Sequence, residues 1–120
     1  MAVSTKEVQG LLRRVGDGEV MPKLAGRGWS DIFCGNVEFN VDGWIVIIFN
    51  DSDEFDYIDS VVAPDGRRGC FDDWFGLPDD EGDRAWEQPD SLLYVEDEAC
   101  FRRMVAAFER APGGAKWARH

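Results

Sequence analysis

One stretch limits the fold of this chain more than any other, because it joins a period-two pattern, a tight turn and a fully apolar run. Val37, Phe39 and Val41 alternate with polar residues, as on a strand with one buried face. Asp42-Gly43 follows, and Asp-Gly is strongly preferred in the two-residue turn of a β-hairpin. Residues 44–49 are all apolar, which favours a central strand covered on both faces. The sequence therefore predicts a hairpin at the centre of a sheet.

Two more strands are expected after this hairpin. A polar turn at residues 50–54 precedes an apolar-rich run at 55–63, and the tight turn Pro64-Asp65-Gly66-Arg67 leads to a fourth strand at 68–75, at the sheet edge. Because short turns join these strands, neighbours must run antiparallel. Residues 31–75 are predicted to form an antiparallel meander.

Amphipathic helices are predicted on either side of the meander. Residues 4–16 begin with Ser4 and Glu7 at capping-box spacing, and residues 96–111 begin with three carboxylates and carry an apolar stripe. Residues 91–95 fit either a fifth strand or the lead-in to the second helix. We therefore predict a single α+β domain: a four-stranded or five-stranded antiparallel meander flanked by an N-terminal and a C-terminal helix that cover one sheet face. Residues 77–90 form an acidic loop, and residues 112–120 form a loose basic tail.

The negative charge of the chain is concentrated in its middle. Of the formal net charge of −11, residues 50–99 contribute −14, from seventeen Asp and Glu against three Arg. Nucleic acid is itself a polyanion, so direct nucleic-acid binding is disfavoured. A basic protein partner or a bound cation is favoured, and the remaining interpretation is that the charge only keeps the chain in solution.

The side chains needed for common catalytic and metal sites are scarce. The single His is the last residue, and Cys34, Cys70 and Cys100 are too few and too widely spaced for a zinc site or a disulfide framework. No apolar run reaches the roughly 20 residues of a membrane span. We predict a cytoplasmic protein without cofactor and without catalytic activity.

The candidate binding surface combines carboxylates with aromatic rings. Rings supply buried area at an interface and charges steer the encounter, and spaced carboxylates can imitate phosphates. This predicts a stoichiometric inhibitor of a basic partner, either an immunity protein against a toxin or a nucleic-acid-mimicking anti-defence protein. Alternatively, the tryptophans pack in the core and the acids are solvated. The candidate partner-binding residues are Asp51, Asp53, Asp56, Asp72, Asp73, Trp74, Asp79, Asp80, Glu81, Asp83 and Trp86.

Asp51, Asp53 and Asp56 also allow a different function. Carboxylate oxygens bind calcium and magnesium, so these three residues are weak candidates for a metal site in a small divalent-cation-dependent hydrolase. Phe55 stands where a third ligand of a calcium loop is expected, and neither its glycine nor its terminal Glu follows. A polar turn that bonds its own backbone explains the same residues.

Several short motifs of the meander occur together in a known pattern. They are Asp42-Gly43-Trp44, Phe49-Asn50-Asp51-Ser52-Asp53, Asp56-Tyr57, Pro64-Asp65-Gly66-Arg67 and Phe71-Asp72. In this order they resemble a family of small uncharacterised proteins found mainly in Pseudomonas and its relatives, in which the pattern follows an N-terminal helix. The resemblance covers about residues 4–75 and implies a shared fold. It implies no activity, and the acidic stretch at 77–90 lies outside it.

Overall fold

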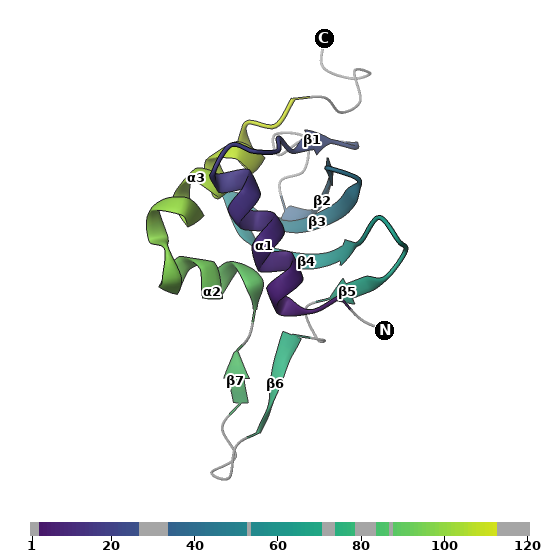
Figure 1. Cartoon of the computed structure of the whole chain (residues 1–120). Coiled ribbons are helices and arrows are strands. Elements are labelled where there is room, and N and C mark those ends of the chain that lie inside the picture. Colours follow the sequence, from purple (N-terminus) through teal and green to yellow (C-terminus); the bar gives the residue numbers. More distant parts are fainter. Residues whose placement is uncertain are drawn as a thin grey trace.

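The predicted hairpin is present at the centre of a five-stranded antiparallel sheet with strand order β1-β2-β3-β4-β5 (Figure 1). β2 (Cys34–Val41) pairs with β3 (Trp44–Asp51), β4 (Glu54–Val62) pairs with β3, and β5 (Arg68–Cys70) pairs with β4. At the first turn, Asp42 and Gly43 have φ values of 47° and 84°, the left-handed conformation that a type I′ turn requires. The computed structural model describes residues 3–26, 34–52, 54–70, 74–78, 84–86 and 88–112, with backbone alone at 75–78 and 84–86.

A fifth strand is present, but it does not lie at residues 91–95, where the sequence allowed either a strand or the lead-in to a helix. β1 (Lys23–Leu24) lies outside every helix and strand that the sequence predicted. It pairs with β2, and the Leu24 amide donates to the Pro112 carbonyl at 2.9 Å. Residues 91–95 belong instead to a helix, α2 (Pro89–Glu96). Pro89 lies in its first turn, where the missing N–H of proline costs no hydrogen bond.

The predicted C-terminal helix at 96–111 is present, and α2 directly precedes it. α2 ends at Glu96, and α3 (Glu98–Glu109) begins two residues later. Asp97 between them has φ −156°, and its carboxylate accepts from the Cys100 amide as the N-cap of α3. The N-terminal helix, α1 (Thr5–Gly16), has the predicted capping box between Ser4 and Glu7.

The acidic stretch contains secondary structure that was not predicted. β6 (Phe75–Pro78) and β7 (Arg84–Trp86) pair antiparallel as a separate two-stranded hairpin, which projects from the sheet and helices (Figure 1). The predicted fourth strand is therefore shorter than 68–75, because Phe75 belongs to this second hairpin. The basic tail from residue 113 onward lies outside the described residues.

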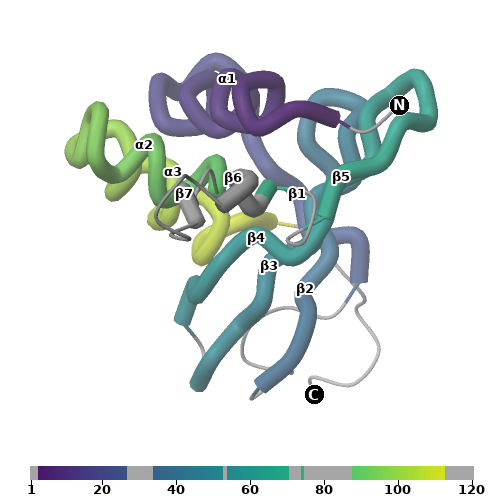
Figure 2. The backbone as a smooth tube through the Cα atoms, turned by 90° about the horizontal axis from the view of Figure 1, so that it is seen from below, coloured from purple at the N-terminus to yellow at the C-terminus, as the bar shows by residue number. Residues whose placement is uncertain are grey.

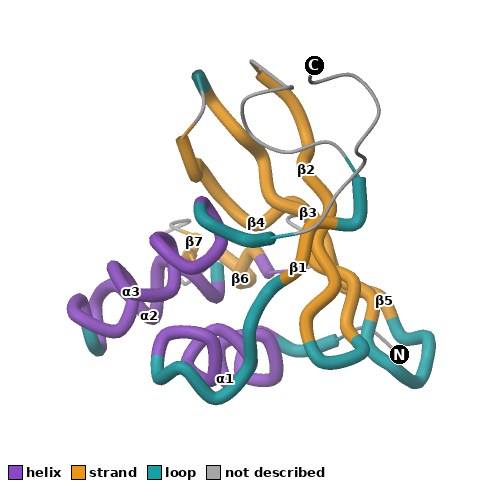
Figure 3. Tube along the Cα trace, turned by 90° about the horizontal axis from the view of Figure 1, so that it is seen from above, coloured by secondary structure: helices purple, strands orange, loops and turns teal. Residues whose placement is uncertain are grey.

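The core lies between the helices and one face of the sheet (Figures 2 and 3). Leu12 of α1, Ile48 of β3 and Phe108 of α3 are fully buried, and the Phe108 ring meets Phe39 edge-on with 4.9 Å between centroids. At the end of α1, Gly16 lies so close to Cys100 of α3 that an added Cβ would be 2.6 Å from the Cys100 carbonyl oxygen. Both helical regions therefore cover one sheet face, as predicted.

The opposite sheet face has no described helix against it. Opposed residues of antiparallel neighbours share a face, so the buried Val37, Ile48 and Ile58 define an inner face. Ile45, Ile47 and Phe49 alternate onto the outer face, where each is half-buried. β3 is apolar on both faces, but the second cover that this pattern predicts is not found among the described residues. Within the same residues, no helix has the length and apolar character that a membrane span requires.

Candidate functional site: the strand carboxylates

Two β-bulges shape β4 and place acidic side chains at the bulged positions. Ile47 and Ile48 of β3 pair with Ser60 and Ile58, so Asp59 is the additional residue. In the same way, Asp56 is the additional residue between Tyr57 and Phe55. A bulge bends its strand and redirects a side chain, and bulges are common beside binding sites. Asp56 is exposed and Asp59 is half-buried.

The bent half of β4 is held by carboxylates from the helices. Among the described residues, β5 pairs with Ser60, Val61 and Val62, and no described strand pairs with the earlier part of β4 at this sheet edge. Glu109 of α3 accepts from the Phe55 amide at 3.1 Å, and Asp90 of α2 accepts from the Ile58 amide. These two carboxylates are structural, because they cover the open strand edge.

The burial of Asp90 is unfavourable for the charged form of its carboxyl group. The residue is only 5% exposed, and its Oδ1 has no hydrogen-bond partner among the described residues. Burial raises the pKa of Asp90 from 3.8 to about 6, against the lowering effect of hydrogen bonds from backbone groups of Asp90, Ile58 and Ser91. The nearby charge of Asp56 raises this pKa further. Asp56 therefore lies close enough for its charge to act on the buried carboxyl group of Asp90.

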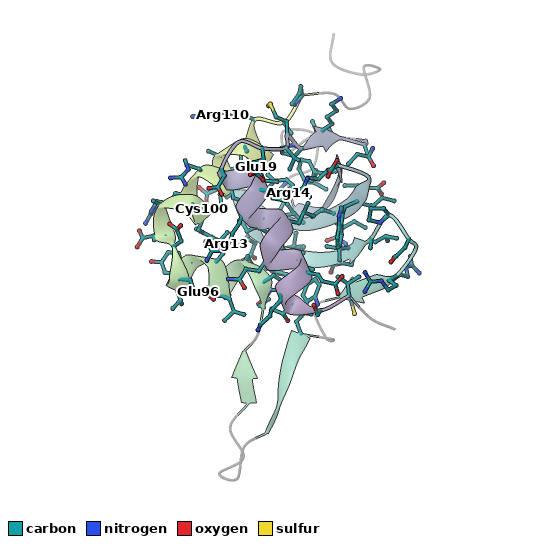
Figure 4. All side chains as sticks on the ribbon, viewed as in Figure 1. Arg13, Arg14, Glu19, Glu96, Cys100 and Arg110 are labelled. Carbon is teal, nitrogen blue, oxygen red and sulfur yellow. The ribbon has the colours of Figure 1, made fainter. Side chains whose placement is uncertain are left out.

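Outside the strands, most described carboxylates are neutralised by arginine. Arg13 lies 3.2 Å from Glu96, and Arg14 lies 3.7 Å from Glu19 (Figure 4). Arg14 also pairs with Asp42 at 2.6 Å. The other ion pairs between described residues join Arg13 to Asp97, Arg67 to Glu7 and Asp65, Arg102 to Glu98, and Arg103 to Asp17. Hydrogen bonds from Arg67 lower the pKa of Glu7 from 4.5 to about 2, so Glu7 stays charged beside its partner.

The carboxylates on the strands themselves differ from this pattern. None of the five has an arginine or lysine within 4 Å among the described residues, and four of them are exposed. Asp51 and Glu54 lie directly opposite each other across β3 and β4, an arrangement that destabilises a strand pair when both are charged. We call these five residues the strand carboxylates: Glu38, Asp51, Glu54, Asp56 and Asp59.

The predicted binding residues divide into three groups. Asp51 and Asp56 are exposed strand carboxylates. The prediction of Trp74 as a surface anchor is corrected: the residue is 2% exposed and packs in the core, where its Nε1–H donates to the Val3 carbonyl at 3.3 Å. Trp86 is described as backbone of β7 only. Outside the described residues lie Asp53, Asp72, Asp73, Asp79, Asp80, Glu81 and Asp83.

Glu38, Glu54 and Asp59 were not among the binding residues that the sequence predicted. Each lies within or next to a predicted strand, but the neighbouring sequence does not show whether an acidic side chain pairs with an arginine in the folded chain. No cluster of three or more His, Cys, Asp or Glu that could hold a metal ion occurs in the part of the chain that the structure describes.

The comparison with protein families adds one finding. A family profile matches residues 2–106, which is most of the chain. The chain belongs to the family described as Domain of unknown function (DUF7693). The DUF7693 match includes α1, the whole five-stranded sheet and most of α3, so the strand carboxylates lie within the family domain. No curated protein and no solved structure matches the chain.

Magnesium or calcium is expected to leave the thermal stability of the protein unchanged. A ligand that binds the native state raises the melting temperature, whereas exposed carboxylates without a metal geometry bind these ions too weakly to do so. We expect a shift below about 1 °C at about 10 mM of either ion in differential scanning fluorimetry. A rise of several degrees that disappears in Asp51→Asn would instead support the cation-dependent hydrolase.

Proposed function

We propose that this protein is a non-enzymatic, acidic protein-binding module that acts as a stoichiometric inhibitor of a basic partner. The partner is a toxin countered by an immunity-like protein, or a nucleic-acid-binding protein countered by a mimic of its substrate. The setting is the bacterial cytoplasm, in Pseudomonas or a relative, as the motif pattern of the meander implies.

One observation carries this proposal: the strand carboxylates have no basic partner among the described residues, whereas most other described acids do. Acids anywhere on the surface would serve solubility equally well. Uncompensated charges on neighbouring strands, including the directly opposed Asp51 and Glu54, destabilise the free protein. A partner that supplies arginine or lysine removes this repulsion on binding.

The scaffold suits recognition through charge. Strands hold side chains at fixed spacings, so the carboxylates can meet a matching set of cations without ordering a loop first. Charge complementarity of this kind speeds association and excludes acidic competitors. Nucleic acid is itself an acidic competitor, so we expect no direct binding to DNA or RNA.

The test compares two triple variants that have the same net charge. Asp51→Asn/Glu54→Gln/Asp56→Asn removes three strand carboxylates, and Asp17→Asn/Asp42→Asn/Glu98→Gln removes three acids that are paired with arginine. Each takes the formal net charge from −11 to −8, since three acids are removed. Binding of an oligoarginine peptide of about ten residues is measured by isothermal titration calorimetry at low salt.

We expect the strand triple variant to bind the peptide at least about tenfold more weakly than the unmodified protein, and the control triple variant to stay within about threefold. Equal losses in both variants would mean that only total charge matters, and the proposed surface would be wrong.

A further inference from the structure

The outer face of the sheet is a surface whose composition can be derived row by row from the strand register. Across β2, β3 and β4, Asn36, Phe49 and Tyr57 form one row, and Cys34, Asp51 and Glu54 form the next. Further along the strands, in the opposite direction from the Asn36 row, the same face carries two more rows. One consists of Glu38, Ile47, Ser60 and Cys70, and the other of Asn40, Ile45, Val62 and Arg68. We call these residues the outer face.

The middle of the outer face is apolar. Ile45, Ile47, Phe49, Tyr57 and Val62 are all half-buried there, and the rings of Phe49 and Tyr57 stack with 5.2 Å between centroids. Between β3, β4 and β5 this surface is hollowed into an open cavity of about 240 Å³, lined by Ile47, Ser60, Val61, Val62, Arg68, Gly69 and Cys70. The cavity has room for one or two apolar side chains from outside.

The border of the apolar patch is charged, with carboxylates at one end and an arginine at the opposite corner. Glu38, Asp51 and Glu54 lie on the β2 side and at the β3–β4 turn, and none has a basic partner among the described residues. Arg68 lies at the opposite corner, exposed and beside the cavity, and no carboxylate lies within salt-bridge distance of it in the described part of the chain.

We propose that the outer face is the docking surface for a basic segment of another protein that carries apolar side chains between its lysines or arginines. The apolar side chains enter the cavity and cover Phe49 and Tyr57, and the basic side chains meet Glu38, Asp51 and Glu54. Arg68 repels basic side chains at the opposite corner, so the basic side chains of the segment gather near the β3–β4 turn.

A second copy of this chain is a poor occupant of the same face. Two copies would bring the same carboxylates together, each on a chain of formal net charge −11, and this repulsion opposes a symmetric pairing. A partner of opposite charge gains from the same groups.

This inference rests on the proposed function and adds apolar contacts to the charge pairing by which the partner is recognised. Its test uses two peptides with equal charge, acetyl-Lys-Phe-Lys-Ile-Lys-Val-Lys-amide and acetyl-Lys-Gly-Lys-Gly-Lys-Gly-Lys-amide, titrated into the full chain at low salt. We expect the apolar-containing peptide to bind at least about tenfold more tightly, since its side chains bury apolar area that glycine lacks.

Variants then locate the difference. Val62→Thr keeps the β-branched shape that a strand favours but places a hydroxyl in the cavity, and Val95→Thr makes the same change at an exposed position on α2. We expect Val62→Thr to reduce the preference for the apolar peptide by about fivefold and Val95→Thr to leave it unchanged. Thermal unfolding of each variant by circular dichroism establishes that it is folded.

The outcomes separate the two proposals. If both peptides bind with equal affinity and their binding is lost in Asp51→Asn/Glu54→Gln/Asp56→Asn, the inference about the outer face is wrong and the proposed function stands. If neither peptide binds at low salt, the proposed function is wrong as well. A preference for the apolar peptide that Val62→Thr and Val95→Thr reduce equally would also overturn the outer face as its site.

Discussion

Replacing Gly16 by Ala is expected to lower the free energy of unfolding by about 2–3 kcal/mol, because the added methyl group has no room between α1 and α3. A Cβ at this position would lie 2.5 Å from the Cys100 Sγ and 2.6 Å from the Cys100 carbonyl oxygen. The sulfur could turn away, but the carbonyl belongs to the backbone of α3. The two helices must therefore separate, which loosens the core that both share. Urea denaturation followed by tryptophan fluorescence measures the loss.

Gly10 provides the matched control on the same helix. It is exposed, and a Cβ added there meets nothing within 4 Å. Alanine is favoured over glycine inside a helix, so Gly10→Ala should raise the free energy of unfolding by about 0.5–1 kcal/mol. If Gly16→Ala were as harmless as Gly10→Ala, the close packing of α1 on α3 would be incorrect.

The second large effect is expected at Asp90, and it depends on pH. The folded state raises the pKa of Asp90 from 3.8 to about 6, so the folded protein holds this proton more tightly than the unfolded chain does. The stability that the neutral carboxyl contributes is complete below about pH 4 and is lost as the pH rises through 6. A shift of this size corresponds to about 3 kcal/mol.

Asp90→Asn removes the charge and keeps an oxygen that can accept from the Ile58 amide. Above pH 6 the variant should therefore be more stable than the unmodified protein, by up to about 3 kcal/mol, and below about pH 4 the two should be equal. Urea denaturation from about pH 4 to 8 gives the difference directly. A variant that is less stable at every pH would show that the charged hydrogen bonds at the β4 edge outweigh the cost of burial.

The parts of the fold that the sequence predicted are those specified by neighbouring residues. The alternation up to Val41, the turn at Asp42-Gly43 and the capping box of Ser4 and Glu7 are all local, and each is confirmed. β1 was missed because two residues carry no periodicity, and it exists through pairing with β2 and a hydrogen bond to Pro112. For the α2 region the sequence left two alternatives open, because the apolar run after Ser91 fits a strand as well as a helix.

The candidate site was predictable in composition and not in arrangement. The sequence located negative charge around Asp51 and Asp56, but it could not show which acids are neutralised. Arg14 and Asp42 are 28 residues apart and Arg13 and Glu96 are 83 residues apart, so these pairs form only in the folded chain. The bulges at Asp56 and Asp59 also depend on the partner strand. Trp74 looked like a surface anchor because its neighbours are acidic, but its ring fills the core beside Val3.

The central claim is that the strand carboxylates, and not acidity in general, receive the basic partner. Backbone amide chemical shifts of the ¹⁵N-labelled protein, followed while the oligoarginine peptide is added, test this residue by residue. We predict that the largest changes occur at Asp51, Glu54, Asp56 and their neighbours on the outer face, and that they fade as salt is raised. Changes of equal size at Glu7, Glu96 and Glu98, where arginine already neutralises the carboxylate, would contradict the account.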